Sequence, residues 1–331
     1  MLKTETIEKR QLGKNGPQVS AVSLGLMSLS GLYGPSDDDA GVAFIQYAID
    51  RGVNFVDSSD AYGNGQNEQV LGRALKGRRD KVILATKFGQ KRSATGTVID
   101  GRPEYVMEAC EASLKRLGVD AIDVYFQHRV DPTVPIEDTM GAMKKLVEQG
   151  KARWLGLSEA SPETVRRAAK VHPLVALESE YSLLYRKEAE DTLPVTRELG
   201  ISYVAYGPLG RSMLTGTVSK PEDVASDRRA DHPRFKGDNL AKNRKLVDVI
   251  DAMAKAKGCT PAQLALAWLL AQGPDLIPIP GTKRKERLEE NLGALSVKLS
   301  KDDVAKLSAA FPVGAAAGTR YPEGQMKAVY V

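Results

Sequence analysis

The feature that most constrains this sequence is an alternation of short apolar runs with longer amphipathic segments, which continues along nearly the whole chain. We count eight such pairs. Consecutive apolar residues are typical of strands buried on both faces, and strands that alternate with helices predict a parallel sheet. The expected strands are Ala21–Met27, Asn54–Asp57, Val82–Lys87, Ala121–Gln127, Arg153–Ser158, Val175–Ser179, Ser202–Tyr206 and Leu276–Pro278.

The amphipathic segments carry helix periodicity, and several stop one or two positions before a glycine, where a left-handed C-cap favours that residue. The expected helices are Asp38–Arg51, Asn67–Leu75, Arg102–Leu117, Ile136–Gln149, Pro162–Lys170, Ala189–Leu199, Arg244–Lys257 and Lys283–Leu292. Eight strand-helix units predict an α/β protein with a (β/α)₈ TIM barrel as a single domain over residues 1–331.

Some segments fall outside the eight units. Thr6–Val19 contains a turn signal and predicts a hairpin that closes the lower end of the barrel. Pro261–Gln272 and Lys301–Phe311 predict two extra helices towards the C-terminus. The charged segment Gly207–Asn243 is expected to be a long functional loop, and residues 312–331 an extended or disordered tail.

Composition excludes several classes of protein. The net charge is +5, but 47 basic residues are interleaved with 42 acidic ones, so no nucleic-acid partner is expected. No apolar stretch is long enough to span a membrane, and the first residues lack the apolar core of a signal peptide, so we expect a cytoplasmic protein. Cys110 and Cys259 are too few for a disulfide framework or a metal cluster. The oligomeric state stays unknown.

Four reactive side chains follow expected strands. Asp57, Lys87 and His128 stand at or just after strand ends, and Tyr62 follows Asp57 by five positions. Active sites of such barrels lie at the C-terminal ends of the strands, so we expect these groups to share one pocket. Together they suit proton donation to an oxygen, because a lysine ammonium lowers the pKa of a nearby tyrosine. Each residue taken singly also has a structural interpretation as an ion pair or packing residue.

Other catalytic motifs are missing from the sequence. Residues 63–68 begin like a dinucleotide fingerprint, but the third glycine is absent and no strand precedes them directly. A phosphate-binding P-loop, a zinc-protease motif and a serine-hydrolase elbow are also absent. These absences remove the usual support for nucleotide hydrolysis, zinc catalysis and serine hydrolysis.

Motifs along residues 8–312 resemble the aldo-keto reductase superfamily. The first is Asn54-Phe-Val-Asp57-Ser-Ser-Asp-Ala-Tyr62-Gly63, and further matching segments include Asp123-Val-Tyr-Phe-Gln-His128 and Pro280-Gly281-Thr282. The resemblance implies reduction of aldehydes or ketones with NADPH. It makes Tyr62 the general acid, Lys87 the group that tunes it, Asp57 the partner of Lys87, and His128 the residue that orients the carbonyl.

The start of the last helix carries four cations, Lys283, Arg284, Lys285 and Arg287, where backbone N–H groups already favour phosphate. A solvated surface cluster is the alternative. With the resemblance, this segment implies NADP rather than NAD, with Lys283 and Arg287 on the 2′-phosphate. The other cofactor-binding residues implied are Asp57, Ser158, Glu159, Glu178, Tyr206, Gly207, Pro208, Leu209, Gly210, Arg211, Leu214, Gly281, Thr282, Glu290 and Asn291.

The sequence departs from the family pattern at three cofactor positions, one of which is Gly207, where Ser is frequent. Glu159 stands where many relatives have Asn, and Glu178 stands where Gln is more usual. A carboxylate accepts hydrogen bonds but cannot donate them, which puts contact with the nicotinamide amide at these positions in doubt. The resemblance implies a substrate pocket lined by residues that follow the strands, here including Met27, Tyr33, Phe88 and Arg129.

Two other functions stay open at this stage. A binding protein similar to the β subunits of potassium channels would share the barrel and keep the cofactor for redox sensing. A barrel enzyme acting on sugar phosphates would bind phosphate without affinity for NADPH. The substrate itself, a small carbonyl compound, is not identified by the sequence.

Overall fold

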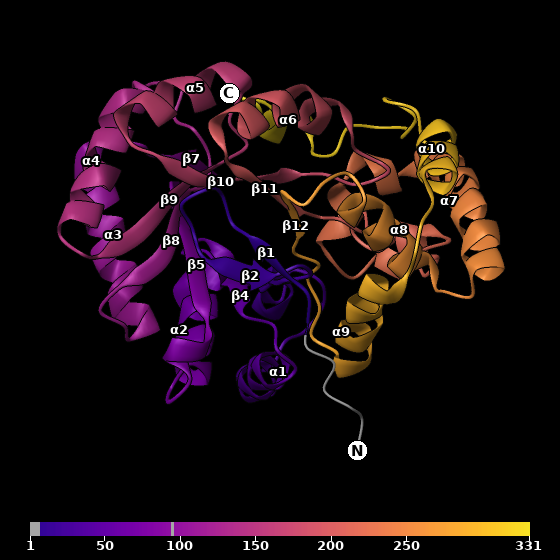
Figure 1. Ribbon diagram of the computed structural model, residues 1–331, viewed down its shortest axis with the longest axis horizontal. Helices are drawn as coiled ribbons and strands as arrows, with labels where there is room; N and C mark the ends of the chain where they lie inside the picture. Colours follow the sequence, from indigo (N-terminus) through magenta and orange to yellow (C-terminus); the bar gives the residue numbers. More distant parts are fainter. Residues whose placement is uncertain (1–6, 94–95) are drawn as a thin grey trace.

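Eight parallel strands form the centre of the protein in this computed structural model, which describes residues 7–93 and 96–331 (Figure 1). In sheet order they are β12 (Leu276–Pro278), β11 (Ser202–Tyr206), β10 (Leu174–Glu180), β9 (Ala152–Ser158), β8 (Ile122–Gln127), β5 (Ile83–Phe88), β4 (Phe55–Asp57) and β3 (Leu24–Gly25). A parallel bridge between Gly25 and Gly281 joins the two outer strands. The Ser23 N–H also donates to the Pro278 carbonyl at 2.9 Å. The predicted TIM barrel is confirmed.

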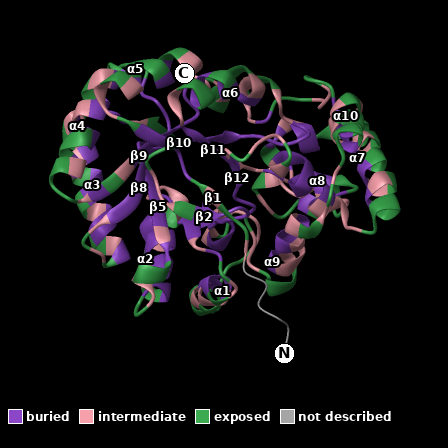
Figure 2. Cartoon of the chain, viewed as in Figure 1, coloured by how far each residue is buried: buried purple, intermediate pink, exposed green. Residues whose placement is uncertain are grey.

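Helices surround the sheet, with their buried faces inward and their exposed faces outward (Figure 2). Seven of them are α1 (Asp38–Asp50), α2 (Gln66–Ala74), α3 (Pro103–Leu117), α4 (Ile136–Glu148), α5 (Pro162–Val171), α6 (Lys187–Leu199) and α9 (Lys285–Leu292). On the side away from α3 and α4 lie α7 (Gly237–Lys257), α8 (Pro261–Leu270) and α10 (Lys301–Ala310). The apolar helix α8 is buried along most of its length, as its composition predicts.

Local signals in the sequence explain where helices begin and end. Gly118, Gly200 and Gly258 cap α3, α6 and α7 in the left-handed conformation that glycine adopts without strain. The Ser161 side chain accepts from the Thr164 N–H at the start of α5, with Pro162 at the first helical position. These caps fix the helix bounds independently of the barrel.

An N-terminal hairpin closes the lower end of the barrel. It pairs β1 (Lys9–Gln11) with β2 (Gln18–Ser20) in antiparallel register. Leu12 and Val19 are fully buried and belong to the barrel's interior cluster, which also contains Phe55 and Phe126. The hairpin was predicted over Thr6–Val19, and Thr6 lies outside the described residues.

Three segments differ from the sequence predictions. Helix α7 begins at Gly237, so residues 237–243 are helical rather than part of the expected loop, and short 3₁₀ turns interrupt residues 213–235. A small hairpin of β6 (Gln90–Ser93) and β7 (Gly96–Ile99) follows β5 and was not predicted. The segment after Phe311 contains a short helix, α11 (Glu323–Met326), and packs against the barrel, with Arg320 only 1% exposed.

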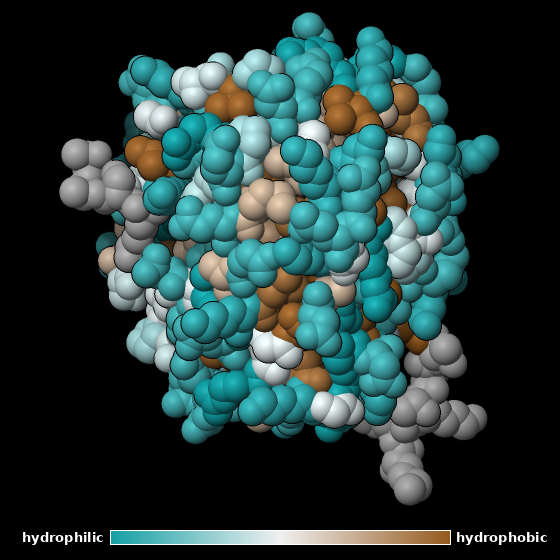
Figure 3. All heavy atoms as spheres, turned by 90° about the vertical axis from the view of Figure 1, so that its left-hand side faces the viewer, coloured by the Kyte–Doolittle hydropathy of each residue, from teal (hydrophilic) through white to brown (hydrophobic). Residues whose placement is uncertain are grey.

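One face of the molecule is mostly polar (Figure 3). The face shown in Figure 3 is largely hydrophilic, with small hydrophobic areas between charged side chains. Among the described residues, no helix is both long and apolar enough to cross a membrane.

Candidate active site

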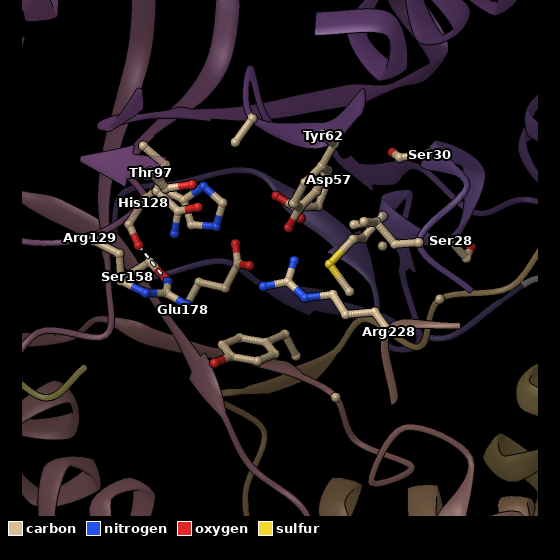
Figure 4. A pocket seen from close by; sticks show the side chains of 18 of the residues that line it. Ser28, Ser30, Asp57, Tyr62, Thr97, His128, Arg129, Ser158, Glu178 and Arg228 are labelled. Atoms are coloured by element: carbon tan, nitrogen blue, oxygen red, sulfur yellow. Dashed lines mark hydrogen bonds between the residues drawn. The ribbon is translucent and has the colours of Figure 1, made fainter. Parts of the chain in front are cut away.

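A cavity of about 1530 Å³ opens at the C-terminal ends of the strands. Tyr62, Asp57 and His128 line one part of it, and Lys283 and Arg287 line another. Polar side chains from several strands point into this space (Figure 4). A volume of this size exceeds that of most small-ligand sites, so it has room for a dinucleotide and a substrate together.

Tyr62, Lys87, His128 and Asp57 meet in one cluster, as the sequence predicts. The Lys87 ammonium lies 5.2 Å from the centre of the Tyr62 ring, and the Tyr62 and His128 ring centres are 5.7 Å apart. Lys87 donates to an Asp57 carboxylate oxygen and to the Ser58 carbonyl at 2.9 Å. Lys87 is fully buried and does not line the cavity, whereas the other three residues do.

The turn after β4 places Tyr62 in the cavity. Gly63, Asn64 and Gly65 have φ of 56°, 56° and 89°, values that residues other than Gly and Asn rarely adopt. A Cβ on Gly65 would lie 2.6 Å from the Arg116 side chain, so helix α3 leaves space only for glycine there. The Tyr-Gly-Asn-Gly sequence is therefore required by the backbone that presents the phenol.

Two buried carboxylates hold Lys87. Asp57 contacts its ammonium directly, and Glu178 Oε1 lies 3.3 Å from Nζ. Burial lowers the pKa of Lys87, but Asp57 and Glu178 outweigh burial, so its pKa is raised and it stays charged. Burial raises the pKa of both carboxyls, that of Glu178 to about 8. The pair therefore retains a proton at neutral pH.

The predicted lowering of the Tyr62 pKa is wrong as a net effect. Burial raises the pKa of Tyr62 and outweighs Lys87, which acts in the expected direction, while Asp57 and Glu178 add to the rise. The sequence identified the cation but not the depth of burial or the second carboxylate. The phenol is consequently protonated throughout the neutral range and can serve as a donor.

His128 is an uncharged imidazole in this site. Burial lowers its pKa well below the ordinary value, and Arg129 and Lys87 add to that effect. The Ser59 hydroxyl lies 3.0 Å from Nδ1 of the ring, and the backbone N–H of His128 donates to the Phe88 carbonyl at 2.7 Å, which holds the main chain at this position. These contacts fix the ring edge-on to Tyr62.

Cations from the start of α9 line the cavity, as predicted. Lys283 Nζ donates to the carbonyls of Tyr33, Gly34 and Pro35, the last at 2.6 Å, and so connects two loops across the opening. Arg287 pairs with Glu290 at 2.6 Å. Arg284 also lines the cavity, with 63% of its side chain exposed. The backbones of Gly281 and Gly25 form a bridge at this wall of the cavity. A Cβ on Gly281 would lie 3.2 Å from the Gly25 carbonyl oxygen.

Of the four residues expected around a nicotinamide ring, three line the cavity and one does not. Ser158, Glu178 and Tyr206 line the cavity. Glu159 does not line it: its carboxylate accepts from Tyr206 Oη at 2.7 Å and pairs with Arg320, so direct contact with an amide is not open to it. Glu178 Oε2 and Asp57 Oδ1 are both buried and have no hydrogen-bond donor among the described residues, which fits one proton shared between the two carboxyl groups.

Several predicted cofactor residues lie behind the cavity wall. Gly207, Pro208, Leu209 and Arg211 line it as expected, together with Gly281 and Thr282. Leu214 does not line the cavity, and its side chain is fully buried in the hydrophobic core. The remaining residues of that set that do not line the cavity are Gly210, Glu290 and Asn291.

Three of the four predicted substrate residues, Met27, Tyr33 and Arg129, line the cavity. The prediction for Phe88 is wrong. Successive strand residues point to opposite faces, so Phe88 points away from the side on which Lys87 lies. Its ring stacks on Tyr125 outside the barrel, with centres 5.1 Å apart.

Sequence reasoning missed cavity residues from distant loops. Arg228 lines the cavity and is drawn with Tyr62 and Glu178 in Figure 4, and its guanidinium donates to Gln325 at 3.3 Å. Tyr321 and Gln325 from the C-terminal segment also form part of the wall. No periodicity marks these positions, so only the unusual density of arginines in residues 211–234 hinted at them.

The fold and the cluster define a class: a TIM barrel with a tyrosine, a lysine, a histidine and a carboxylate at the mouth of its strands. The family model for the "Aldo/keto reductase family" matches residues 21–311. The chain therefore belongs to the aldo/keto reductase family, whose members are oxidoreductases that act on carbonyl groups and generally use nicotinamide cofactors.

Similar proteins agree with this assignment. The chain is 46% identical to "Probable aldo-keto reductase 1" of Glycine max over 96% of its own length and 93% of that protein. The structure of a glycerol dehydrogenase, AKR11B4 from Gluconobacter oxydans, is similar with a TM-score of 0.81, at 29% identity over 94% of this chain and 97% of that one. The holo form of aldo-keto reductase AKR11C1 from Bacillus halodurans gives 0.78, at 27% identity over 93% and 97%.

Proposed function

We propose that this protein reduces aldehydes or ketones to alcohols with NADPH, and that Tyr62 is the general acid. The observation that supports this proposal most strongly is the cluster in which Tyr62 lies beside both Lys87 and His128 at the cavity wall. A protonated phenol beside a charged lysine and a neutral imidazole offers hydrogen-bond donors to one carbonyl oxygen. Such a set stabilises the negative charge that develops there during reduction.

The residues of this chain have separate parts in the reaction. NADPH, when bound, supplies a hydride to the carbonyl carbon. Tyr62 donates its proton to the carbonyl oxygen, a contribution typically worth 10² to 10⁴ in rate. His128 orients the carbonyl, and Lys87 favours the phenolate that Tyr62 leaves behind. The negative charge held by the Asp57 and Glu178 pair, chiefly on Asp57, keeps Lys87 charged.

NADP rather than NAD is proposed because cations from the start of α9 line the cavity. Lys283 and Arg287 would hold the 2′-phosphate, and Arg284, which is the most exposed of the three, would join them. Ser158 and Glu178 line the cavity and suit the nicotinamide amide, whose N–H groups need an acceptor. Tyr206 would stack on the ring.

The substrate is proposed to be a small carbonyl compound held between Met27, Tyr33 and Arg129. Arg129 donates to the His128 carbonyl at 2.6 Å and to Ser158 at 3.3 Å and has no carboxylate partner within the described part of the chain. A buried guanidinium without a counter-ion favours a substrate with an electronegative group next to its carbonyl.

Fluorescence titration of the purified protein with NADPH and NADH, followed by assays with a panel of aldehydes, tests this function. We expect tight binding of NADPH and measurable turnover. The Tyr62→Phe variant is expected to bind NADPH as the unchanged protein does and to lose activity by roughly 10² to 10⁴. Tight NADPH binding without Tyr62-dependent turnover would instead indicate a redox-sensing barrel.

A further inference from the structure

The C-terminal segment reaches the centre of the barrel mouth through one buried ion pair. Arg320 is 1% exposed and Glu159, at the end of β9, is 2% exposed. The guanidinium contacts both carboxylate oxygens of Glu159, with Nη1 at 2.7 Å from Oε1. Glu159 itself has a φ of 57°, an uncommon conformation for a glutamate, and its carbonyl accepts from the Val331 N–H at 3.2 Å.

This pair lies directly behind the tyrosine that faces the cavity. Tyr206 lines the cavity and donates from its hydroxyl to Glu159 Oε1 at 2.7 Å. The Tyr321 hydroxyl, from the same segment as Arg320, lies 2.9 Å from the Tyr206 hydroxyl. The net charge of the Arg320 and Glu159 pair therefore changes the electrostatic potential at the ring of Tyr206.

Among the described arginines, only Arg320 forms an ion pair with Glu159, while Arg129 interacts with that carboxylate electrostatically without an ion pair. Arg211 and Arg234 hold Glu180 at 3.1 and 3.2 Å, while Arg320 lies 3.8 Å from that carboxylate. The arginine pairs of Glu180 hold the pKa of that carboxyl at about 2. Removing Arg320 would thus leave Glu159, and not Glu180, as the uncompensated carboxylate.

We propose that Arg320 is a positioning residue that neutralises Glu159 and thereby sets the relative affinity of the site for reduced and oxidised cofactor. The inference rests on the proposed NADPH site, with the nicotinamide stacked on Tyr206. The ring is neutral in NADPH and carries one positive charge in NADP⁺. An uncompensated carboxylate one side chain away would attract only the charged form, and Arg320 removes that preference.

The test measures dissociation constants for both cofactor forms by fluorescence titration at several pH values above neutral. In Arg320→Met we expect NADP⁺ affinity to rise relative to NADPH affinity by on the order of tenfold, corresponding to about 1.4 kcal/mol. In Glu159→Gln the uncompensated arginine should shift the ratio in the opposite direction. The double variant Glu159→Gln, Arg320→Met should return it close to the original ratio.

Arg186→Met is the matched control. Arg186 also pairs with a glutamate, Glu190, and anchors the C-terminal region by donating to the Ser308 and Phe311 carbonyls at 2.7 Å, but it does not line the cavity. We expect this variant to lose stability with no change in the affinity ratio. A ratio that moves in Arg186→Met as it does in Arg320→Met would overturn the inference.

The remaining outcomes are decisive as well. Equal changes in both affinities in Arg320→Met and Glu159→Gln would assign the pair a purely structural part and overturn the inference while leaving the NADPH site intact. Failure of the unchanged protein to bind either form would overturn both. If Arg320→Met does not fold, the opposite shift in Glu159→Gln carries the test by itself.

Discussion

Glu178 Oε1 lies 3.3 Å from Lys87 Nζ, on the same ammonium that Asp57 contacts. The single positive charge of Lys87 therefore faces two buried carboxyl groups. If both carboxyls were ionised, the three side chains together would carry one net negative charge. Burial and the Asp57 charge raise the pKa of Glu178 to about 8. The protonation of the cluster then changes within the range in which enzymes are usually assayed.

This arrangement predicts the pH dependence of catalysis. Ionised Glu178 raises the pKa of Tyr62 and makes it a weaker acid, so kcat/KM for carbonyl reduction should fall as pH rises through about 8. In Glu178→Gln this transition should disappear. Steady-state assays across the range check it, and an unchanged transition in the variant would assign the titration to another group.

The same shift predicts how stability depends on pH. The folded protein keeps a proton on Glu178 up to about 8, whereas the unfolded chain loses it near 4.5. Between these values the folded state binds more protons, so the free energy of unfolding should fall as pH rises through this window. Urea denaturation should show a smaller fall in Glu178→Gln.

Glu198→Gln provides the control for this measurement. Glu198 is an exposed carboxylate whose pKa is lowered by its hydrogen bond with Arg166. Its stabilising effect is present above the unfolded pKa and is lost at lower pH, so it should leave the slope between about 4.5 and 8 unchanged. A Glu178→Gln slope equal to that of the unchanged protein would show that Glu178 ionises normally.

Much of the fold follows from the sequence because its signals are local. Buried apolar runs define the strands, and glycine caps define helix ends such as Gly118 and Gly200. The start of α7 was not predicted, since residues 237–243 are polar and carry no apolar period. The C-terminal segment is held by Arg320 and Glu159, which are 161 positions apart, and no local pattern encodes such a contact.

The site was predictable to the extent that it depends on strand ends. Tyr62 and His128 follow strands β4 and β8, and the closed barrel brings them together. The resemblance implied Phe88 as a pocket residue, but side chains alternate along β5, so its ring lies on the outer face against Tyr125. The sign of the Tyr62 pKa shift required the depth of burial, which one position in a sequence does not give.

Cofactor selectivity provides a third prediction. Lys283→Ala with Arg287→Ala should weaken NADPH binding by on the order of tenfold or more, with little change for NADH, because only NADPH carries the 2′-phosphate. Titration with both cofactors measures the effect. Equal losses for both would place the 2′-phosphate elsewhere, and Arg228 would then be the next cation of the cavity to test.

Two helical glycines give a matched pair for the packing between helices. A Cβ on Gly72 in α2 would collide with the Leu117 carbonyl at the end of α3, whereas a Cβ on Gly141 in α4 would meet no atom within 4 Å. Overpacking typically costs about 1–3 kcal/mol, and a backbone atom cannot move aside as a side chain can. Gly72→Ala should therefore destabilise the protein by at least that amount.

Gly141→Ala should stabilise the protein by about 0.5–1 kcal/mol, because alanine loses less backbone entropy on folding. Urea denaturation compares the two, and similar effects in both variants would show that α2 and α3 can separate without cost.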